Sequence, residues 1–87
     1  MHAVVIRFTI NDRRALPSEL AQVVREVSTA PGFVAVYGVA LDEDQGMSIF
    51  VFDSEVSASL QAIGAQVMEH TSLTVDTSEV GEVVAHA

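Results

Sequence analysis

Residues 33–52, FVAVYGVALDEDQGMSIFVF, contain two apolar stretches separated by a short polar turn. In FVAVYGVAL at 33–41 and in MSIFVF at 47–52, both alternating sets of side chains are mostly apolar. The intervening DEDQG is polar and contains a glycine, which is typical of the connection in a β-hairpin. We therefore predict two adjacent antiparallel strands, both faces of which need to be covered.

A helical pattern precedes the hairpin. Its apolar residues recur every three or four positions, which places them on one side of a helix. They are Leu16, Leu20, Val23, Val24 and Val27. Pro17 suits the first turn, and the helix dipole favours an anion at the position of Glu19. The sequence APG at 30–32 then ends the helix, near Thr29.

A second helical pattern follows the hairpin and runs to about Thr71. Asp53 or Ser54 is suited to cap its N-terminus. Its apolar stripe consists of Val56, Leu60, Ile63 and Val67. Gly64 interrupts the pattern at a cost of ~1 kcal/mol relative to alanine, which is tolerable where a helix and a sheet approach closely.

The two ends of the chain supply the remaining strands. Residues 3–10, AVVIRFTI, alternate so that one face is strongly apolar, while Arg7 lies on the other face. A polar loop, NDRR, follows at 11–14. At the other end we predict that the polar stretch 74–79 is a loop and that VGEVVAH at 80–86 is the last strand.

The predicted order of elements is therefore β-α-β-β-α-β, an α+β domain over residues 1–87. Right-handed crossovers give a ferredoxin-like, four-stranded antiparallel sheet with two helices on one face and the first and third strands in the centre. One layer of helices covers only one face, whereas the hairpin is apolar on both. A second copy of the same sheet is the most economical cover, so we predict a homodimer.

Composition excludes several classes of function. The chain has 87 residues, no cysteine and a net charge of −8. An acidic protein repels nucleic acid and anionic membranes, and no apolar run approaches the ~20 residues of a membrane span. Without cysteine there is no thiolate metal site and no cysteine nucleophile. We expect no nucleic-acid or membrane partner, and a cytoplasmic location.

Three segments resemble a known group of proteins. They are APGF at 30–33, the hairpin, and VFDSE at 51–55, which opens the second helix. Together with the order of elements, they resemble the dimeric α/β-barrel superfamily, in particular its antibiotic-biosynthesis-monooxygenase-like and stress-responsive small members. The resemblance implies two sheets packed face to face in a barrel. That group includes cofactor-free oxygenases, haem-degrading enzymes, isomerases and proteins with no known activity.

The chain differs from the enzymatic members of this group in the second helix. Those members often carry a histidine near the middle of that helix and a tryptophan or asparagine at the pocket. Here the middle of the helix is LQAI at 60–63, and the chain contains no tryptophan. This difference argues against haem degradation.

Tyr37 and His70 are the candidate catalytic residues. Tyr37 lies in mid-strand beside Gly38, where the missing side chain leaves room for a ligand; simple packing is the alternative role for the phenol. His70 lies at the end of the second helix. A general base and a histidine favoured there by the helix dipole are both open interpretations.

The N-terminus of the first helix is a candidate site for an anionic ligand. Asn11, Arg13 and Arg14 precede it, and helix N-termini attract anions. Solvated ion pairs are the alternative role for the arginines. Arg7, in the first strand, lies beside the last strand, so we expect an ion pair with Glu79 or Glu82.

We expect no metal site and no cofactor. The predicted strand pairing brings His2 close to His86, but a third ligand is not evident. The acidic residues at 42–44 do not have the spacing of a calcium-binding loop, and there is no phosphate-binding glycine loop.

Two functions remain open. The first is a protein that binds a small apolar or aromatic molecule between sheet and helices, or oxidises it without a cofactor. Tyr37 and His70 would be its polar groups, with space beside Gly38 and Gly64. The second is a non-catalytic dimerisation or ligand-binding module, which the missing helix histidine favours.

Overall fold

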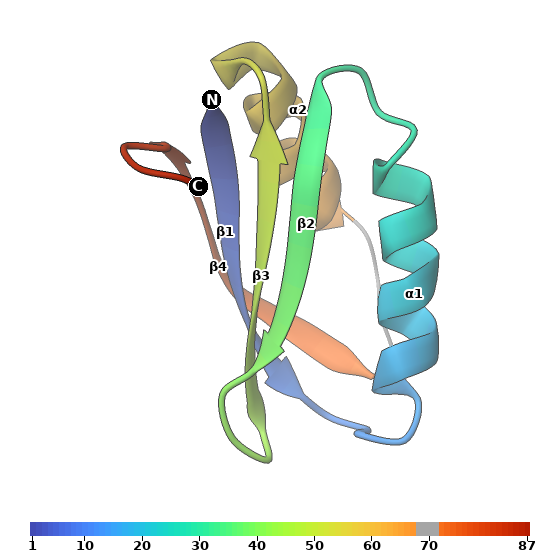
Figure 1. Ribbon diagram of the computed structural model, residues 1–87. Coiled ribbons are helices and arrows are strands. Elements are labelled where there is room, and N and C mark those ends of the chain that lie inside the picture. Colours follow the sequence, from blue (N-terminus) through green and yellow to red (C-terminus); the bar gives the residue numbers. More distant parts are fainter. Residues whose placement is uncertain (68–71) are drawn as a thin grey trace.

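The structure is a computed structural model that describes residues 1–67 and 72–87, with the backbone alone described at 62–67. In this part of the chain the elements follow the predicted β-α-β-β-α-β order (Figure 1). They are β1 (His2–Ile10), α1 (Leu16–Val27), β2 (Phe33–Ala40), β3 (Gln45–Phe52), α2 (Glu55–Val67) and β4 (Leu73–Glu82). Neither of the described helices is long and apolar enough to cross a membrane.

The strands form one antiparallel sheet in the order β2-β3-β1-β4, so β1 and β3 are central, as predicted. The register fixes which residues share a face. Val4 of β1 lies opposite Phe50 of β3 and Val80 of β4, and Phe50 lies opposite Val36 of β2. This arrangement is the predicted ferredoxin-like sheet.

The predicted position of the last strand is wrong. β4 is Leu73–Glu82 rather than 80–86, so the polar stretch 74–79 is a strand and not a loop. β4 is an edge strand that pairs with β1 alone, and many of its side chains are exposed. A half-exposed edge strand accommodates threonine, serine and acidic residues, and its hydrophobic pattern is therefore weak.

α1 and α2 lie on one side of the sheet, and the core is between them and the sheet. In Figure 1, α2 lies behind the sheet and α1 lies beside β2. The β1 side chains that face the helices are buried: Val4, Ile6, Phe8 and Ile10. Phe8 lies opposite Gly46 of β3, where a Cβ atom would overlap its ring. The ring therefore packs directly over the glycine backbone.

The other face of the sheet is largely apolar, and none of the described elements covers it. The register assigns to it Ala3, Val5, Ala35, Tyr37, Val39, Met47, Ile49 and Val51. Tyr37 is 60% exposed and Val39 is 42% exposed. We call this surface the open face. The hairpin strands are thus apolar on both faces, as the sequence predicts.

Charged residues lie on the β1–β4 side of the open face, Arg7 and Glu79 among them. Arg7 lies opposite Thr77 of β4. Glu79, two residues further along β4, lies opposite Val5 and belongs to the same face. Glu82 lies opposite His2 and so belongs to the helix-facing side. The register therefore rules out Glu82 as the partner predicted for Arg7 and leaves Glu79 diagonally across from it.

Candidate functional site

The N-terminus of α1 is where the sequence predicts an anionic ligand. There the Asp12 carboxylate accepts hydrogen bonds from the backbone N–H groups of Arg14, at 3.0 Å, and Ala15, at 3.4 Å. Asp12 already supplies the negative charge that a helix N-terminus favours. Asn11 is directed to β4, where its Nδ2 donates to Thr74 Oγ1 at 2.7 Å. Asn11 thus has a side-chain contact within the fold, whereas the contact of Arg14 with Asp12 uses its backbone N–H.

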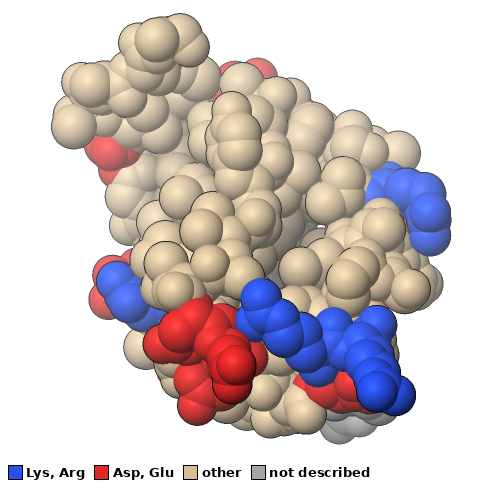
Figure 2. Space-filling model, turned by 60° about the horizontal axis from the view of Figure 1, so that its bottom comes forward, with Lys and Arg blue, Asp and Glu red and all other residues tan. Residues whose placement is uncertain are grey.

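Arg13 connects the β1–α1 loop to the β2–β3 turn. Its Nη1 donates to the backbone oxygens of Asp42, at 2.9 Å, and Glu43, at 3.2 Å. Asp42 also holds the turn, because its Oδ1 accepts from the N–H groups of Asp44, at 3.1 Å, and Gln45, at 2.8 Å. A side-chain hydrogen bond with Asp42 and the charge of that carboxylate raise the pKa of Asp44. Figure 2 shows acidic and arginine side chains together at this end of the molecule.

Tyr37 and Gly38 face opposite sides of the sheet. Tyr37 pairs with Ile49 on the open face, whereas Gly38 pairs with Ser48 on the helix-facing side. Tyr37 is therefore not the polar group of a pocket between sheet and helices, which corrects that part of the hypothesis. His70, the second polar group considered, lies outside the described residues.

Gly38 does border a cavity, which we call the Gly38 cavity. It lies between the first turns of α1 and the end of β2, and its volume is about 220 Å³. Its lining is apolar and comprises Phe8, Leu16, Pro17, Leu20 and residues 38–40. A Cβ atom on Gly38 would lie 3.6 Å from Leu20 Cδ1, so the glycine helps to keep the space open.

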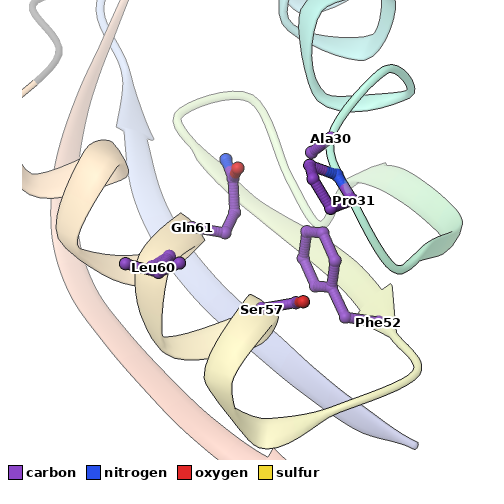
Figure 3. Close-up of a pocket in the computed structure, with 6 residues that line it drawn as sticks. All are labelled: Ala30, Pro31, Phe52, Ser57, Leu60 and Gln61. Carbon is purple, nitrogen blue, oxygen red and sulfur yellow. The ribbon is translucent and has the colours of Figure 1, made fainter.

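A second cavity, which we call the Phe52 cavity, lies near the other end of the sheet (Figure 3). Its volume is about 170 Å³. It is lined by Ala30 and Pro31 of the α1–β2 loop, by Phe52 of β3, and by Ser57, Leu60 and Gln61 of α2. In Figure 3 the Ser57 hydroxyl points toward the Phe52 ring, and Gln61 extends from α2 toward the loop.

Packing fixes the aromatic wall of the Phe52 cavity. The Phe52 side chain is 1% exposed, and its ring meets that of Phe33 edge to face, with the centroids 6.3 Å apart and an interplanar angle of 78°. Such edge-to-face pairs contribute about 0.5–1.5 kcal/mol beyond the burial of apolar area. The position of the Phe52 ring is therefore fixed by its own packing.

The loop and the start of α2 are tied together beside this wall. Gly32 has a φ of 79°, a conformation that favours glycine, and its carbonyl accepts the Asp53 N–H at 2.8 Å. Ser54 caps α2: its Oγ accepts the Ser57 N–H at 3.2 Å and donates to Ser57 Oγ at 3.1 Å. These two hydrogen bonds hold Ser57 in place.

The chemistry of the Phe52 cavity is neutral. Among its lining residues, Ser57 and Gln61 are the polar side chains, and none of the six lining residues titrates near neutral pH. A glutamine amide both donates and accepts, and a serine hydroxyl does the same. The lining therefore combines one aromatic ring with two neutral side chains that can donate and accept hydrogen bonds.

Ser57 and Gln61 were not among the residues predicted from the sequence. They are spaced i, i+4 on α2 and so share one side of the helix, and this spacing was the available signal. The signal was hard to recognise because the predicted apolar stripe of this helix includes Leu60. The stripe was expected to face the core, yet Leu60 is 65% exposed in the structure. Which side of α2 faces the loop is decided by tertiary packing.

No cluster of three or more potential metal ligands occurs in the described residues. The shift of the last strand also changes the surroundings of the two terminal histidines. His2 pairs with Glu82, and His86 lies beyond the end of β4, so the predicted pairing of His2 with His86 is wrong.

Comparison with known proteins gives matches in structure and none in sequence. No protein-family model matches the chain, and no curated protein matches it. SnoaB, a cofactor-independent oxygenase from Streptomyces nogalater, superposes with a TM-score of 0.73 at 15% identity, covering 98% of this chain and 94% of SnoaB. A heme-degrading protein from Mycobacterium tuberculosis superposes with a TM-score of 0.63 at 20% identity, covering 100% of this chain and 99% of that one.

A third match is a dimeric ferredoxin-like protein from an uncultured marine organism, with a TM-score of 0.61, 14% identity, and coverage of 100% of this chain and 98% of that one. At these identities the matches establish the fold. This chain therefore has a ferredoxin-like fold.

Proposed function

We propose that this protein is a homodimer that binds a small aromatic molecule with one polar substituent in the Phe52 cavity. The observation that carries the proposal is the combination of a fixed aromatic wall with two neutral hydrogen-bonding side chains in one space of about 170 Å³. An apolar cavity of ~150 Å³ accommodates benzene, so the volume suits a single ring. Small-molecule sites are typically apolar with a few placed polar groups.

The parts of the cavity have separate roles in this proposal. The ring of the ligand packs against Phe52, whose own ring is held by Phe33. The Gln61 amide, assisted by the Ser57 hydroxyl, hydrogen-bonds the substituent. Because both groups are neutral, a hydroxyl or carbonyl substituent is preferred to a charged one, which would lose its hydration without gaining an ion pair.

Phenol and benzene are the matched probes of this site. In the unmodified protein we expect phenol to bind about tenfold more tightly than benzene, which corresponds to ~1.4 kcal/mol for the hydrogen bond. Gln61→Leu keeps the size of the side chain and removes the amide, and should abolish this preference. Gln22→Leu makes the same change on α1, where the amide contacts Glu26, and should leave the preference intact. Isothermal titration measures both.

The outcome that contradicts the proposal is an equal preference for phenol in the protein and in Gln61→Leu. Perturbation of amide NMR signals by phenol should include those of Ser57 and Gln61. Binding that leaves these signals unchanged would also place the ligand elsewhere.

Oxidation of the bound molecule without a cofactor is a second candidate function, and the match to a cofactor-independent oxygenase favours it. The neutral lining of the cavity favours the alternative, a non-catalytic ligand-binding module. Hydroquinone distinguishes them, because its oxidation to benzoquinone passes two electrons and two protons to O₂, which is reduced to H₂O₂. A protein that catalyses this oxidation should accelerate oxygen uptake and H₂O₂ formation above the rate in buffer, and Gln61→Leu should slow both; a binding module leaves the rate unchanged.

A further inference from the structure

We infer that the free edge of β2 is an association surface, at which the β2 strands of two copies pair antiparallel around Gly38 and join their sheets. The surface consists of the outer backbone groups of β2, which no other described strand uses. None of the residues that line the Phe52 cavity belongs to β2. The inference therefore goes beyond the proposed function and can fail without affecting it.

The hydrogen bonds of the hairpin show which backbone groups lie on this edge. The Leu41 N–H donates to the Gln45 carbonyl at 2.9 Å, so these two residues form a hydrogen-bonded pair. Bonded and non-bonded pairs alternate along an antiparallel ladder, and Tyr37 and Val39 therefore bond toward β3. The N–H and C=O groups at 36, 38 and 40 point away from β3. In Figure 1, β2 is the frontmost strand, and no other element is drawn in front of it.

The two edges of the sheet differ in their protection against pairing. The β4 edge carries Asp76, Glu79 and Glu82, and a register shift interrupts its pairing with β1. Charges and bulges of this kind keep an edge strand from pairing with another chain. β2, FVAVYGVA, has no charged residue and no proline. The β2 edge is thus the one that a further strand can extend.

The partner that fits this edge is a second copy of β2, because the strand is complementary to itself. A two-fold axis at Gly38 pairs Gly38 with its equivalent and Val36 with Ala40, so each outward N–H meets a carbonyl. Gly38 and Ala40 are small and exposed, so no bulky side chain separates the two backbones on the helix-facing side. On the open face, the same register places Tyr37 opposite Val39. Both are exposed in the single chain, and an aromatic and a β-branched side chain stabilise each other across strands.

The distribution of charge favours the antiparallel direction. The acidic turn at 42–44 follows β2, whereas Arg25 lies in the last turn of α1, toward the start of β2. Within the described residues the Arg25 side chain has no hydrogen bond or ion pair, while the Glu26 carboxylate accepts the Gln22 amide at 3.4 Å. Antiparallel pairing brings the turn of one copy toward Arg25 of the other, and parallel pairing would bring the two acidic turns together. The joined sheet then ends in β4 on both sides, so the pairing stops at two copies.

Sedimentation equilibrium of the complete chain, from micromolar to millimolar concentration, tests this inference. We expect the average mass to double over this range, because pairing through one strand edge is weak. Gly38→Pro removes an outward N–H and no hydrogen bond to β3, and should weaken the association roughly tenfold or more. Val80→Pro is the matched control. The Val83 N–H donates to the Met1 carbonyl, so by alternation the Val80 N–H points outward from β4, and its loss should leave the association unchanged.

Hydrogen exchange followed by NMR separates edge pairing from any other contact. The N–H groups of Val36, Gly38 and Ala40 should exchange more slowly at the high end of the concentration range, because packing on the open face does not bond them. If Gly38→Pro does not fold, Ala40→Lys places a charge on the same edge and should cause the same loss. The inference is overturned if the mass stays constant, if the association persists in whichever of these variants folds, or if the three amides exchange equally fast at both concentrations.

Discussion

Single glycines decide how closely the elements of this fold approach one another. Gly46 is buried on β3 under the Phe8 ring, whereas Gly38 on β2 is exposed, and a Cβ atom there would lie at ordinary contact distance, 3.6 Å, from Leu20 Cδ1. Added methyl groups in a packed core force side chains off their preferred conformations at a typical cost of 1–3 kcal/mol. The same substitution therefore has different consequences at the two positions.

Gly46→Ala should lower the free energy of unfolding by about 1–3 kcal/mol, because Phe8 must move off the strand. Gly38→Ala, its matched control, should change it by no more than about 0.5 kcal/mol. Urea unfolding followed by circular dichroism measures both variants. Equal stability of the two variants would show that the Phe8 ring is not held against Gly46.

At the scale of elements, the β1–α1 loop and the β2–β3 turn act as one unit through Arg13. The guanidinium bridges the carbonyl oxygens of Asp42 and Glu43, a contact that a lysine ammonium does not reproduce with the same planar geometry. The turn also accepts the Ile10 N–H at the Asp44 carbonyl, at 2.8 Å. Loss of the bridge should therefore loosen the whole end of the hairpin.

Arg13→Ala should destabilise the protein by about 1 kcal/mol and speed hydrogen exchange at Ile10 and Gln45, because two exposed hydrogen bonds are lost. Arg14→Ala is the control, since the described contact of Arg14 uses its backbone N–H, which alanine retains. Exchange followed by NMR gives the result for each amide. Similar exchange in both variants would mean that Arg13 does not hold the turn.

The elements were predictable from sequence to different degrees. The hairpin and α1 have strong apolar patterns with clear turn residues between them, and both lie close to where they were predicted. β4 was displaced because an edge strand rich in Thr74, Asp76 and Thr77 resembles a loop in its composition. The cavity at Gly38 followed from a missing side chain, but the direction of Tyr37 depends on strand register, which a sequence without alternating polarity does not reveal.

At the scale of the whole molecule, the open face is the feature that the single chain leaves unexplained. Val5, Ile49 and Val51 lie at its centre, with the more exposed Tyr37 and Val39 toward the β2 edge. A contiguous apolar surface of this kind typically marks an interface. A second sheet packed face to face would cover it, and Arg7 and Glu79 on the same face give the two copies charges of opposite sign to pair.

Light scattering coupled to size-exclusion chromatography, at micromolar concentration, tests the predicted homodimer. The chain mass is 9.3 kDa, and we predict that the protein elutes with about twice that mass. Replacing Ile49 at the centre of the open face with aspartate should shift it toward the monomer, because a buried unpaired carboxylate is strongly unfavourable. A mass of 9.3 kDa for the unmodified protein would contradict the predicted homodimer, because the open face would then be exposed to solvent.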